Sequence, residues 1–261
     1  MSETQQAVRV ERLADHVALV TIDRPEARNA VSGAVAAGLE AAIDQTEADD
    51  DVWVVVLTGA GSEAFCAGAD LKAVAAGRGS DLATARGGFA GFVHAPKRKP
   101  WIAAVNGPAL AGGCEIALAC DLIVASTAAR FGLPEVKRGL IASAGGLYRL
   151  PRALPPAIAR EMIATGDPIP AERAHALGMV NVLVEPAQLL EAAKALAARI
   201  TVNAPVSVRE SLAVARRAFD DSDATLRKAS EDGQVRNMAS EDFKEGPRAF
   251  IEKRAPRWVG R

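Results

Sequence analysis

The stretch Val52-Trp53-Val54-Val55-Val56-Leu57-Thr58 decides the fold class, read together with two segments that precede it. It is rich in β-branched residues and predicts a strand. Val17-Ala18-Leu19-Val20-Thr21-Ile22 predicts an earlier buried strand, which stops at Asp23-Arg24-Pro25. Between the two strands, Ser32 can cap a helix that runs to about Asp49. Strand, helix and strand in this order are typical of a parallel crossover unit, so the sequence predicts an α/β fold.

The pattern of strands and helices continues along the chain and then changes. Further strands are expected over 101–105, 122–125 and 179–184, with a helix over 113–119. After about residue 186 the pattern predicts helices only, over 186–200, 205–219, 224–239 and 240–253. We therefore expect an α/β core over 1–200 and a helical C-terminal region over 201–261, whose apolar stripes need a partner surface.

The composition bounds the kind of protein. The chain has 261 residues, 49% of them hydrophobic, which is ample for one large domain, or one domain plus a smaller appendage. Its 31 basic and 32 acidic residues give a net charge of −1, so nothing favours general binding to nucleic acid or to a membrane. The short basic run Lys97-Arg98-Lys99 is best interpreted as a solvated loop.

Cysteine usage and the N-terminus indicate a cytoplasmic protein without a metal. The three cysteines form no CxxC pair, which fits free thiols in a reducing compartment. The three histidines lie in no ligand-spaced cluster, so we expect no metal site. The N-terminus lacks the features of a signal peptide, and no apolar stretch approaches the length of a membrane-spanning helix.

Two glutamates next to conformationally special residues are the strongest candidates for chemistry. Glu115 ends the run Asn106-Gly107-Pro108-Ala109-Leu110-Ala111-Gly112-Gly113-Cys114-Glu115, and Glu135 ends Phe131-Gly132-Leu133-Pro134-Glu135. The apolar neighbours of Glu115 predict burial and a raised pKa, and Glu135 is expected at a loop edge beside the pocket. Two carboxylates in a dry pocket can share acid and base work.

Two glycine-containing loops are candidate oxyanion sites. The loop over 62–71 follows a strand and opens a helix, where exposed N–H groups can polarise a carbonyl oxygen. An ordinary strand-to-helix turn would show the same glycine. The pair Gly112-Gly113 permits close approach of a ligand at a helix N-terminus, and close packing between helices is the alternative explanation.

Taken together, these segments closely resemble the crotonase, or enoyl-CoA hydratase/isomerase, superfamily. Any one piece is weak, but their order and spacing through nearly the whole chain make the resemblance specific. The matching pieces are Ile22–Pro25 with Asn29-Ala30, Val55–Gly59, Phe65–Leu71, Ala103–Gly107, Ala111–Glu115, Cys120-Asp121, Phe131–Glu135, Gly145-Gly146, Thr165-Gly166, Ala176–Val180 and Glu245–Arg254.

The resemblance implies a spiral of ββα turns with a helical C-terminal region that packs in trimers, two of which commonly stack into a hexamer. The implied ligand is an acyl-coenzyme A thioester, with no cofactor besides the coenzyme A of the substrate. Its oxygen would be held by the backbone N–H groups of Ala69 and Gly112, beside the two hydratase glutamates, Glu115 and Glu135. The positions that resemble coenzyme A contacts are Ala67, Gly68, Asp70, Leu71, Phe250 and Lys253. The last two resemble tail residues that can approach coenzyme A from a neighbouring subunit.

The implied reaction is the syn addition of water to a 2-enoyl-CoA, or its reverse, the dehydration of a 3-hydroxyacyl-CoA. The oxyanion donors stabilise enolate character at the thioester, and the carboxylates position one water across the C2–C3 double bond. The sequence leaves open which glutamate acts as acid and which as base, because a close pair titrates as a coupled unit.

Three departures from the family pattern bear on the substrate. Ala111 replaces a glycine, which is tolerable if this residue needs no positive φ. The segment Ile141–Gly146 replaces a commoner proline- and glycine-rich loop, so Ala142 and Ser143 are expected to border the acyl pocket. The tail Glu252–Arg261 resembles the carnitinyl-CoA dehydratase branch of the family.

Alternative functions on the same fold stay open at this point. A carnitinyl-CoA dehydratase-like enzyme is one, and a double-bond isomerase, which would need mainly Glu135, is another. The presence of Glu115 weighs against the isomerase. A non-catalytic acyl-CoA-binding protein is the least favoured, since both glutamates and both loops are retained.

Overall fold

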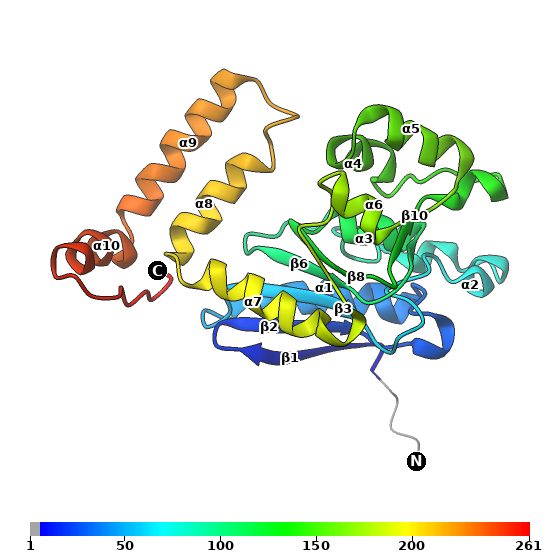
Figure 1. Ribbon diagram of the computed structural model, residues 1–261, viewed down its shortest axis with the longest axis horizontal. Coiled ribbons are helices and arrows are strands. Elements are labelled where there is room, and N and C mark those ends of the chain that lie inside the picture. Colours follow the sequence, from blue (N-terminus) through cyan, green and yellow to red (C-terminus); the bar gives the residue numbers. More distant parts are fainter. Residues whose placement is uncertain (1–5) are drawn as a thin grey trace, which may run out of the picture.

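A six-stranded sheet forms the centre of the protein, as a computed structural model that describes residues 6–261 shows (Figure 1). The strand order is β1-β2-β3-β6-β8-β11, in which β1 is antiparallel to β2 and every other neighbouring pair is parallel. The predicted α/β class is confirmed. The strands are β1 (Val8–Ala14), β2 (Val17–Ile22), β3 (Val54–Gly59), β6 (Trp101–Val105), β8 (Leu122–Ser126) and β11 (Val182–Val184).

The central strands are apolar on both faces because both faces are covered. In β3, Val55 and Leu57 pack into the main core, whereas Val54 and Val56 pack on the opposite face with Ala193 of α7. Side chains alternate between the faces of a strand, so a continuous apolar run is what a doubly covered strand needs. Helix α1 (Gly33–Ala48) belongs to the main core, and α7 (Leu189–Thr201) covers the other face (Figure 1).

The remaining elements surround this sheet. The predicted cap of α1 is confirmed, since the Ser32 side chain accepts a hydrogen bond from the N–H of Val35. The other elements of the core are α2 (Leu71–Ala75), β4 (Ala83–Thr84), β5 (Gly88–Phe89), β7 (Ala109–Leu110), α3 (Gly112–Leu118), β9 (Arg130–Gly132), α4 (Gly146–Ala153), α5 (Pro156–Thr165), β10 (Ile169–Pro170) and α6 (Ala171–Ala176), with short 3₁₀ turns η1 (Pro25–Ala27), η2 (Gly79–Leu82), η3 (Pro134–Arg138) and η4 (Pro186–Gln188).

The C-terminal region is helical, as expected. Helices α8 (Pro205–Ala215), α9 (Asp223–Met238) and α10 (Glu241–Ile251) follow α7 and extend away from the sheet (Figure 1). Exposed apolar side chains such as Val235 and Phe250 remain on these helices. The division of the chain at residue 200 and the packing of this region into trimers stay predictions.

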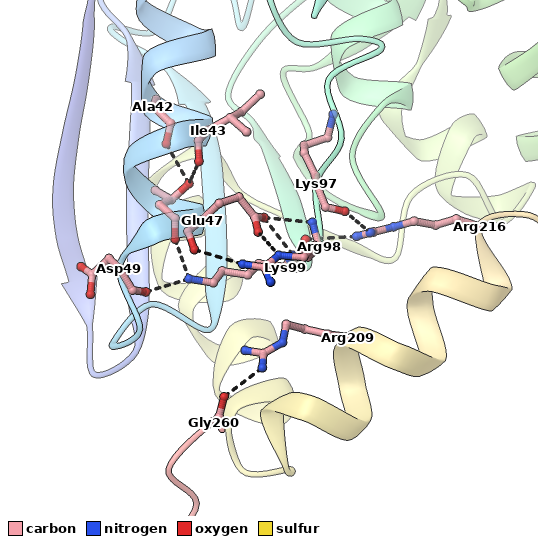
Figure 2. Close-up of polar contacts among 11 residues, drawn as sticks. Ala42, Ile43, Glu47, Asp49, Lys97, Arg98, Lys99, Arg209, Arg216 and Gly260 are labelled. Carbon is pink, nitrogen blue, oxygen red and sulfur yellow. Dashed lines mark hydrogen bonds and ion pairs between the residues drawn. The ribbon is translucent and has the colours of Figure 1, made fainter. Parts of the chain in front are cut away.

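The interpretation of Lys97–Lys99 as a solvated loop is wrong. Figure 2 shows the loop joined to α1 and α8 by polar contacts. Lys99 is only 2% exposed, and its ammonium donates to the carbonyl oxygens of Thr46 and Asp49 at the end of α1, at 2.6 and 2.7 Å. A cation at a helix C-terminus satisfies carbonyls that have no partner in the helix. Arg98 pairs with Glu47 of the same helix.

Arg216 connects the end of α8 to the same loop. Its guanidinium donates to the carbonyl oxygens of Lys97 and Lys99 (Figure 2), and to both carboxylate oxygens of Asp121 at 2.7 and 2.8 Å. Asp121 in turn accepts from the N–H of Trp101 at the start of β6. One arginine therefore fixes the C-terminal helices to the central sheet, a role that the sequence did not reveal.

Candidate active site

A second, smaller sheet brings the two glutamates to the same edge. Its order is β10-β9-β7, with β7 parallel to β9. The register pairs Ala109 with Phe131 and Leu110 with Gly132. Because parallel strands end at the same edge of a sheet, the segments after β7 and β9 emerge together. Glu115 lies in α3 after β7, and Glu135 lies in the 3₁₀ turn after β9.

Glu115 is buried in surroundings that favour its protonated form. Its side chain is 3% exposed, and Oε1 accepts a hydrogen bond from the N–H of Gly146 at 2.8 Å. Burial raises the pKa of Glu115 to about 7; the negative charge of Glu135 adds to the rise, while the Gly146 N–H and Arg149 oppose it. A carboxyl group with this pKa can gain or lose a proton near neutral pH.

Glu135 offers an acceptor that no protein group uses. It is half-buried, and its Oε2 is buried without a hydrogen-bond partner in the described structure. Burial also raises the pKa of Glu135. A buried acceptor without a partner is rare in proteins and indicates a position where a water or ligand completes the bonding. The expected place of Glu135 beside a pocket stays a prediction.

Two backbone N–H groups lie close together at the expected oxyanion positions. Val31 bonds to Gly68 and Asp70 in a parallel bridge, so the N–H of Ala69 points to the other side of its strand. Gly112 is the first residue of α3, and its N–H has no acceptor within the helix. A Cβ placed on Gly68, where φ is +89°, would lie 3.1 Å from the nitrogen of Gly112. The two loops are therefore in direct contact beside the two donors.

The glycine pair also has the packing role that was the alternative explanation. A Cβ on Gly113 would overlap the carbonyl group of Cys66, and one on Gly112 would overlap the ring of Phe89. Both glycines are buried. Close packing and an exposed helix N-terminus thus occur at the same residues, and the sequence could not have separated the two explanations.

The condition placed on Ala111 is not met. Its φ is +51° and its ψ is −128°, a conformation that glycine adopts freely and alanine rarely. Its methyl group lies against Gly68, 2.9 Å from where a Cβ on that residue would be. The replacement of glycine at this position therefore introduces backbone strain between the two loops.

The expected coenzyme A positions divide into two groups. Ala67, Gly68, Asp70 and Leu71 lie in the loop that carries Ala69, and Leu71 is 53% exposed at the start of α2. Asp70 has a structural role in this loop, since its side chain caps α2 and pairs with Arg24. Phe250 and Lys253 are exposed at the end of α10, far from α2 and α3 within one chain (Figure 1).

The expected acyl-pocket residues differ in burial. Ala142 is 3% exposed and packs beside Gly146, whereas Ser143 is exposed. Sequence reasoning missed the contact between this segment and Glu115, and it missed Phe89 and Arg149. The pair Gly145-Gly146 was the sequence signal for the contact with Glu115. Gly145 has a φ of +116° just before α4, a conformation that favours glycine.

The cysteines near this site are free thiols, and the described residues form no cluster of metal ligands. All three cysteines are free, and burial raises the pKa of Cys66 and Cys120 to about 12, so their thiols stay neutral. Within residues 6–261, no group of three or more histidine, cysteine, aspartate or glutamate side chains could hold a metal ion. Over the same range, no helix is both long and apolar enough to cross a membrane.

Comparison with known proteins places the chain in a family. The model of the enoyl-CoA hydratase/isomerase family matches residues 12–261. The chain belongs to this family. Among curated relatives, a carnitinyl-CoA dehydratase of Salmonella arizonae is 41% identical over 246 residues, which cover 92% of this chain and 94% of the relative. The resemblance read from the sequence is confirmed.

Solved structures of the enoyl-CoA hydratase/isomerase family confirm the predicted crotonase fold, including the C-terminal helices. An enoyl-CoA hydratase from Mycobacterium tuberculosis is 49% identical, with a TM-score of 0.93 over 98% of this chain and 100% of that one. A carnitinyl-CoA hydratase from Mycobacterium avium is 50% identical, with a TM-score of 0.79 over 99% of this chain and 100% of that one.

Proposed function

We propose that this family member is an enoyl-CoA hydratase that adds water to a 2-enoyl-CoA with syn stereochemistry, or removes it from the 3-hydroxyacyl-CoA. The observation that carries the proposal is the pair of carboxyl groups after β7 and β9. Glu115 has a pKa of about 7, and Glu135 has a buried oxygen without a partner. An isomerase has no need of two such groups.

Each part of the site has one role in this mechanism. The N–H groups of Ala69 and Gly112 hold the thioester oxygen and stabilise the negative charge that develops on it. Glu115 and Glu135 hold one water beside the double bond. One glutamate, as a carboxylate, accepts a proton from the water as the water oxygen bonds to C3. The other, as a carboxylic acid, donates its proton to C2, so a hydroxyl group and a hydrogen are added overall.

A carnitinyl-CoA dehydratase activity is the second candidate. It is favoured by the names of the curated relatives and of two solved structures. Its acyl group carries a trimethylammonium cation, which proteins usually bind with aromatic faces or carboxylates. Arg149 donates to the carbonyl oxygen of Ala144, next to the expected acyl-pocket residues, and so places a positive charge there. This charge favours an acyl group without a cation.

The two candidates are separated by substrate comparison. Purified protein is incubated with a series of trans-2-enoyl-CoA thioesters and with crotonobetainyl-CoA, and the loss of the conjugated enoyl absorbance is followed. The proposal predicts hydration of uncharged enoyl-CoA thioesters at a higher kcat/KM than crotonobetainyl-CoA. A preference for crotonobetainyl-CoA would support the second candidate, and no hydration of any thioester would refute both.

Three further expectations belong with this proposal. The chemistry is complete with the two glutamates and the substrate, so we propose that no cofactor is required beyond the coenzyme A of the thioester. Phe250 and Lys253 lie far from the site in their own chain, which supports their contribution from a neighbouring subunit in a trimer or hexamer (Figure 1). The three cysteines are free thiols, which fits our proposal of a cytoplasmic location.

A further inference from the structure

Arg149 links two segments of the chain beside the candidate active site. It lies on α4, half-buried, and its guanidinium donates from Nη2 to the carbonyl oxygen of Val93 at 2.6 Å and from Nη1 to that of Ala144 at 3.1 Å. The two carbonyl oxygens are reached by separate nitrogens of one planar guanidinium, a geometry that the single nitrogen of a lysine ammonium does not reproduce.

The segment that Arg149 holds is the one that contacts Glu115. Ala144 begins the turn Ala144–Gly146, and the N–H of Gly146 donates to Glu115 at 2.8 Å. The N–H of Ala144 also lowers the pKa of the Glu115 carboxyl group. A Cβ on Gly145 would overlap the Arg149 guanidinium, so this group packs directly on the backbone of the turn.

We propose that Arg149 is a positioning residue for Glu115, because it fastens the turn Ala144–Gly146 to the carbonyl of Val93. Glu115 is held by this turn, so movement of the turn moves the carboxylate relative to the substrate. The kinetic part of this inference rests on the proposed hydratase function.

The charges around both groups define the expected direction of change. Glu115 faces Glu135, which raises its pKa, and Arg149, which lowers it; the neighbouring Cys114 keeps a neutral thiol because burial raises the pKa of that thiol. Arg149 itself is surrounded by Tyr148, Arg152, Cys120 and His94. Removal of the Arg149 charge therefore moves the pKa of Glu115 further up from about 7.

Arg152 supplies a matched control one turn along the same helix. Its guanidinium lies over the ring of Tyr148 and pairs with Asp220 at 2.6 Å, without a bond to the turn Ala144–Gly146. Both arginines line a cavity of about 1070 Å³ between the core and α8. Arg152→Met thus removes a positive charge from the same wall and leaves the turn in place.

The test compares Arg149→Met, Arg149→Lys and Arg152→Met in the full chain. Infrared difference spectroscopy follows the C=O stretch of the protonated Glu115 carboxyl against pH, with Glu115→Gln as the blank. The kcat and KM for a trans-2-enoyl-CoA are measured over the same pH range. Thermal melts establish that each variant is folded.

We expect Arg149→Met to raise the pH at which Glu115 titrates and to lower kcat by about 10- to 100-fold, the range for a misplaced reacting group, with KM changed by less than about twofold. Arg149→Lys should titrate like the wild type and still lose kcat, because it restores the charge but not the two bonds. Arg152→Met should change neither.

Two results would overturn the inference. One is an Arg149→Met variant in which both the titration of Glu115 and kcat equal those of the wild type. The other is an Arg152→Met variant in which the titration of Glu115 shifts as much as in Arg149→Met. If Arg149→Met fails to fold, an unchanged kcat in Arg149→Lys would contradict the positioning role, and a reduced kcat would support it. A wild-type protein that hydrates no thioester would refute the proposed function, and the infrared titration would still decide whether Arg149 acts on Glu115.

Discussion

At the scale of single residues, the requirements of stability and of function conflict at Glu115. Its pKa rises from an ordinary value of 4.5 to about 7 on folding. The folded state therefore holds the proton more tightly than the unfolded chain between these values. The contribution of this group to stability is fully present below about pH 4.5 and is lost as the pH rises through about 7. Above pH 7, the buried carboxylate destabilises the fold.

Glu115→Gln is expected to abolish most activity and to stabilise the protein at pH 8. The pKa shift corresponds to about 3 kcal/mol as an upper bound, because one unit of pKa is worth about 1.4 kcal/mol. Urea denaturation at pH 8 and pH 5 measures the difference between variant and wild type, which should nearly vanish at pH 5. The exposed Glu63 provides the control Glu63→Gln. A variant less stable than the wild type at pH 8 would contradict this account.

Ala111→Gly tests the strain at the contact between the two oxyanion loops. Relief of a positive-φ alanine is expected to raise the free energy of unfolding by about 1 kcal/mol, after the entropy cost of glycine. Ala109→Gly serves as the control, because Ala109 is buried in β7 without a positive φ and should lose stability. The midpoints of chemical denaturation decide the matter, and a destabilised Ala111→Gly would show that the methyl contact with Gly68 outweighs the strain.

At the scale of elements, long apolar segments were predictable and short ones were not. Strands β2 and β6 have the predicted bounds, because four or more consecutive apolar residues leave little choice. Strand β1 was missed: its alternation starts at Val8 and Val10 and is then broken by a register shift between Arg12 and Ala14. Strands β7 and β9 have two and three residues, too few to show a period of two.

The same distinction applies to the site. Burial of Glu115 followed from its apolar neighbours, and its position in sequence sufficed to suggest the chemistry. The bonds from Arg149 to Val93 and from Gly146 to Glu115 join residues 56 and 31 positions apart. No local pattern encodes such pairings, since they depend on how the smaller sheet and α4 pack together.

The connection between α8 and the core gives a prediction at this scale. Arg216→Met removes the bonds to Asp121 and to the carbonyl oxygens of Lys97 and Lys99, so Asp121 keeps only its bond from the N–H of Trp101. We expect a loss of about 1–3 kcal/mol of stability and faster hydrogen exchange in α8. The adjacent Arg217 has only a surface pair with Asp221, so Arg217→Met should change stability by less than about 0.5 kcal/mol. Equal effects in the two variants would refute the role of Arg216.

At the scale of the whole molecule, the fold brings the residues of the candidate site together from separate segments of the chain. The loop after β3 brings Ala69, the turn after β7 brings Gly112 and Glu115, and the turn after β9 brings Glu135. Family membership accounts for this arrangement, and the identities of 49–50% to both an enoyl-CoA hydratase and a carnitinyl-CoA hydratase leave the acyl group to the residues around it. We expect those residues to include Ala142 and the positively charged Arg149.

The central claim is that Glu115 and Glu135 act as one unit on a single water. The direct measurement is kcat/KM for hydration of a trans-2-enoyl-CoA by the wild type, Glu115→Gln, Glu135→Gln and the double variant. Each single change should reduce kcat/KM by about 100-fold or more, and the double change should cost little more than either one. Wild-type activity in either single variant, or a double variant whose loss equals the product of the single losses, would contradict the claim.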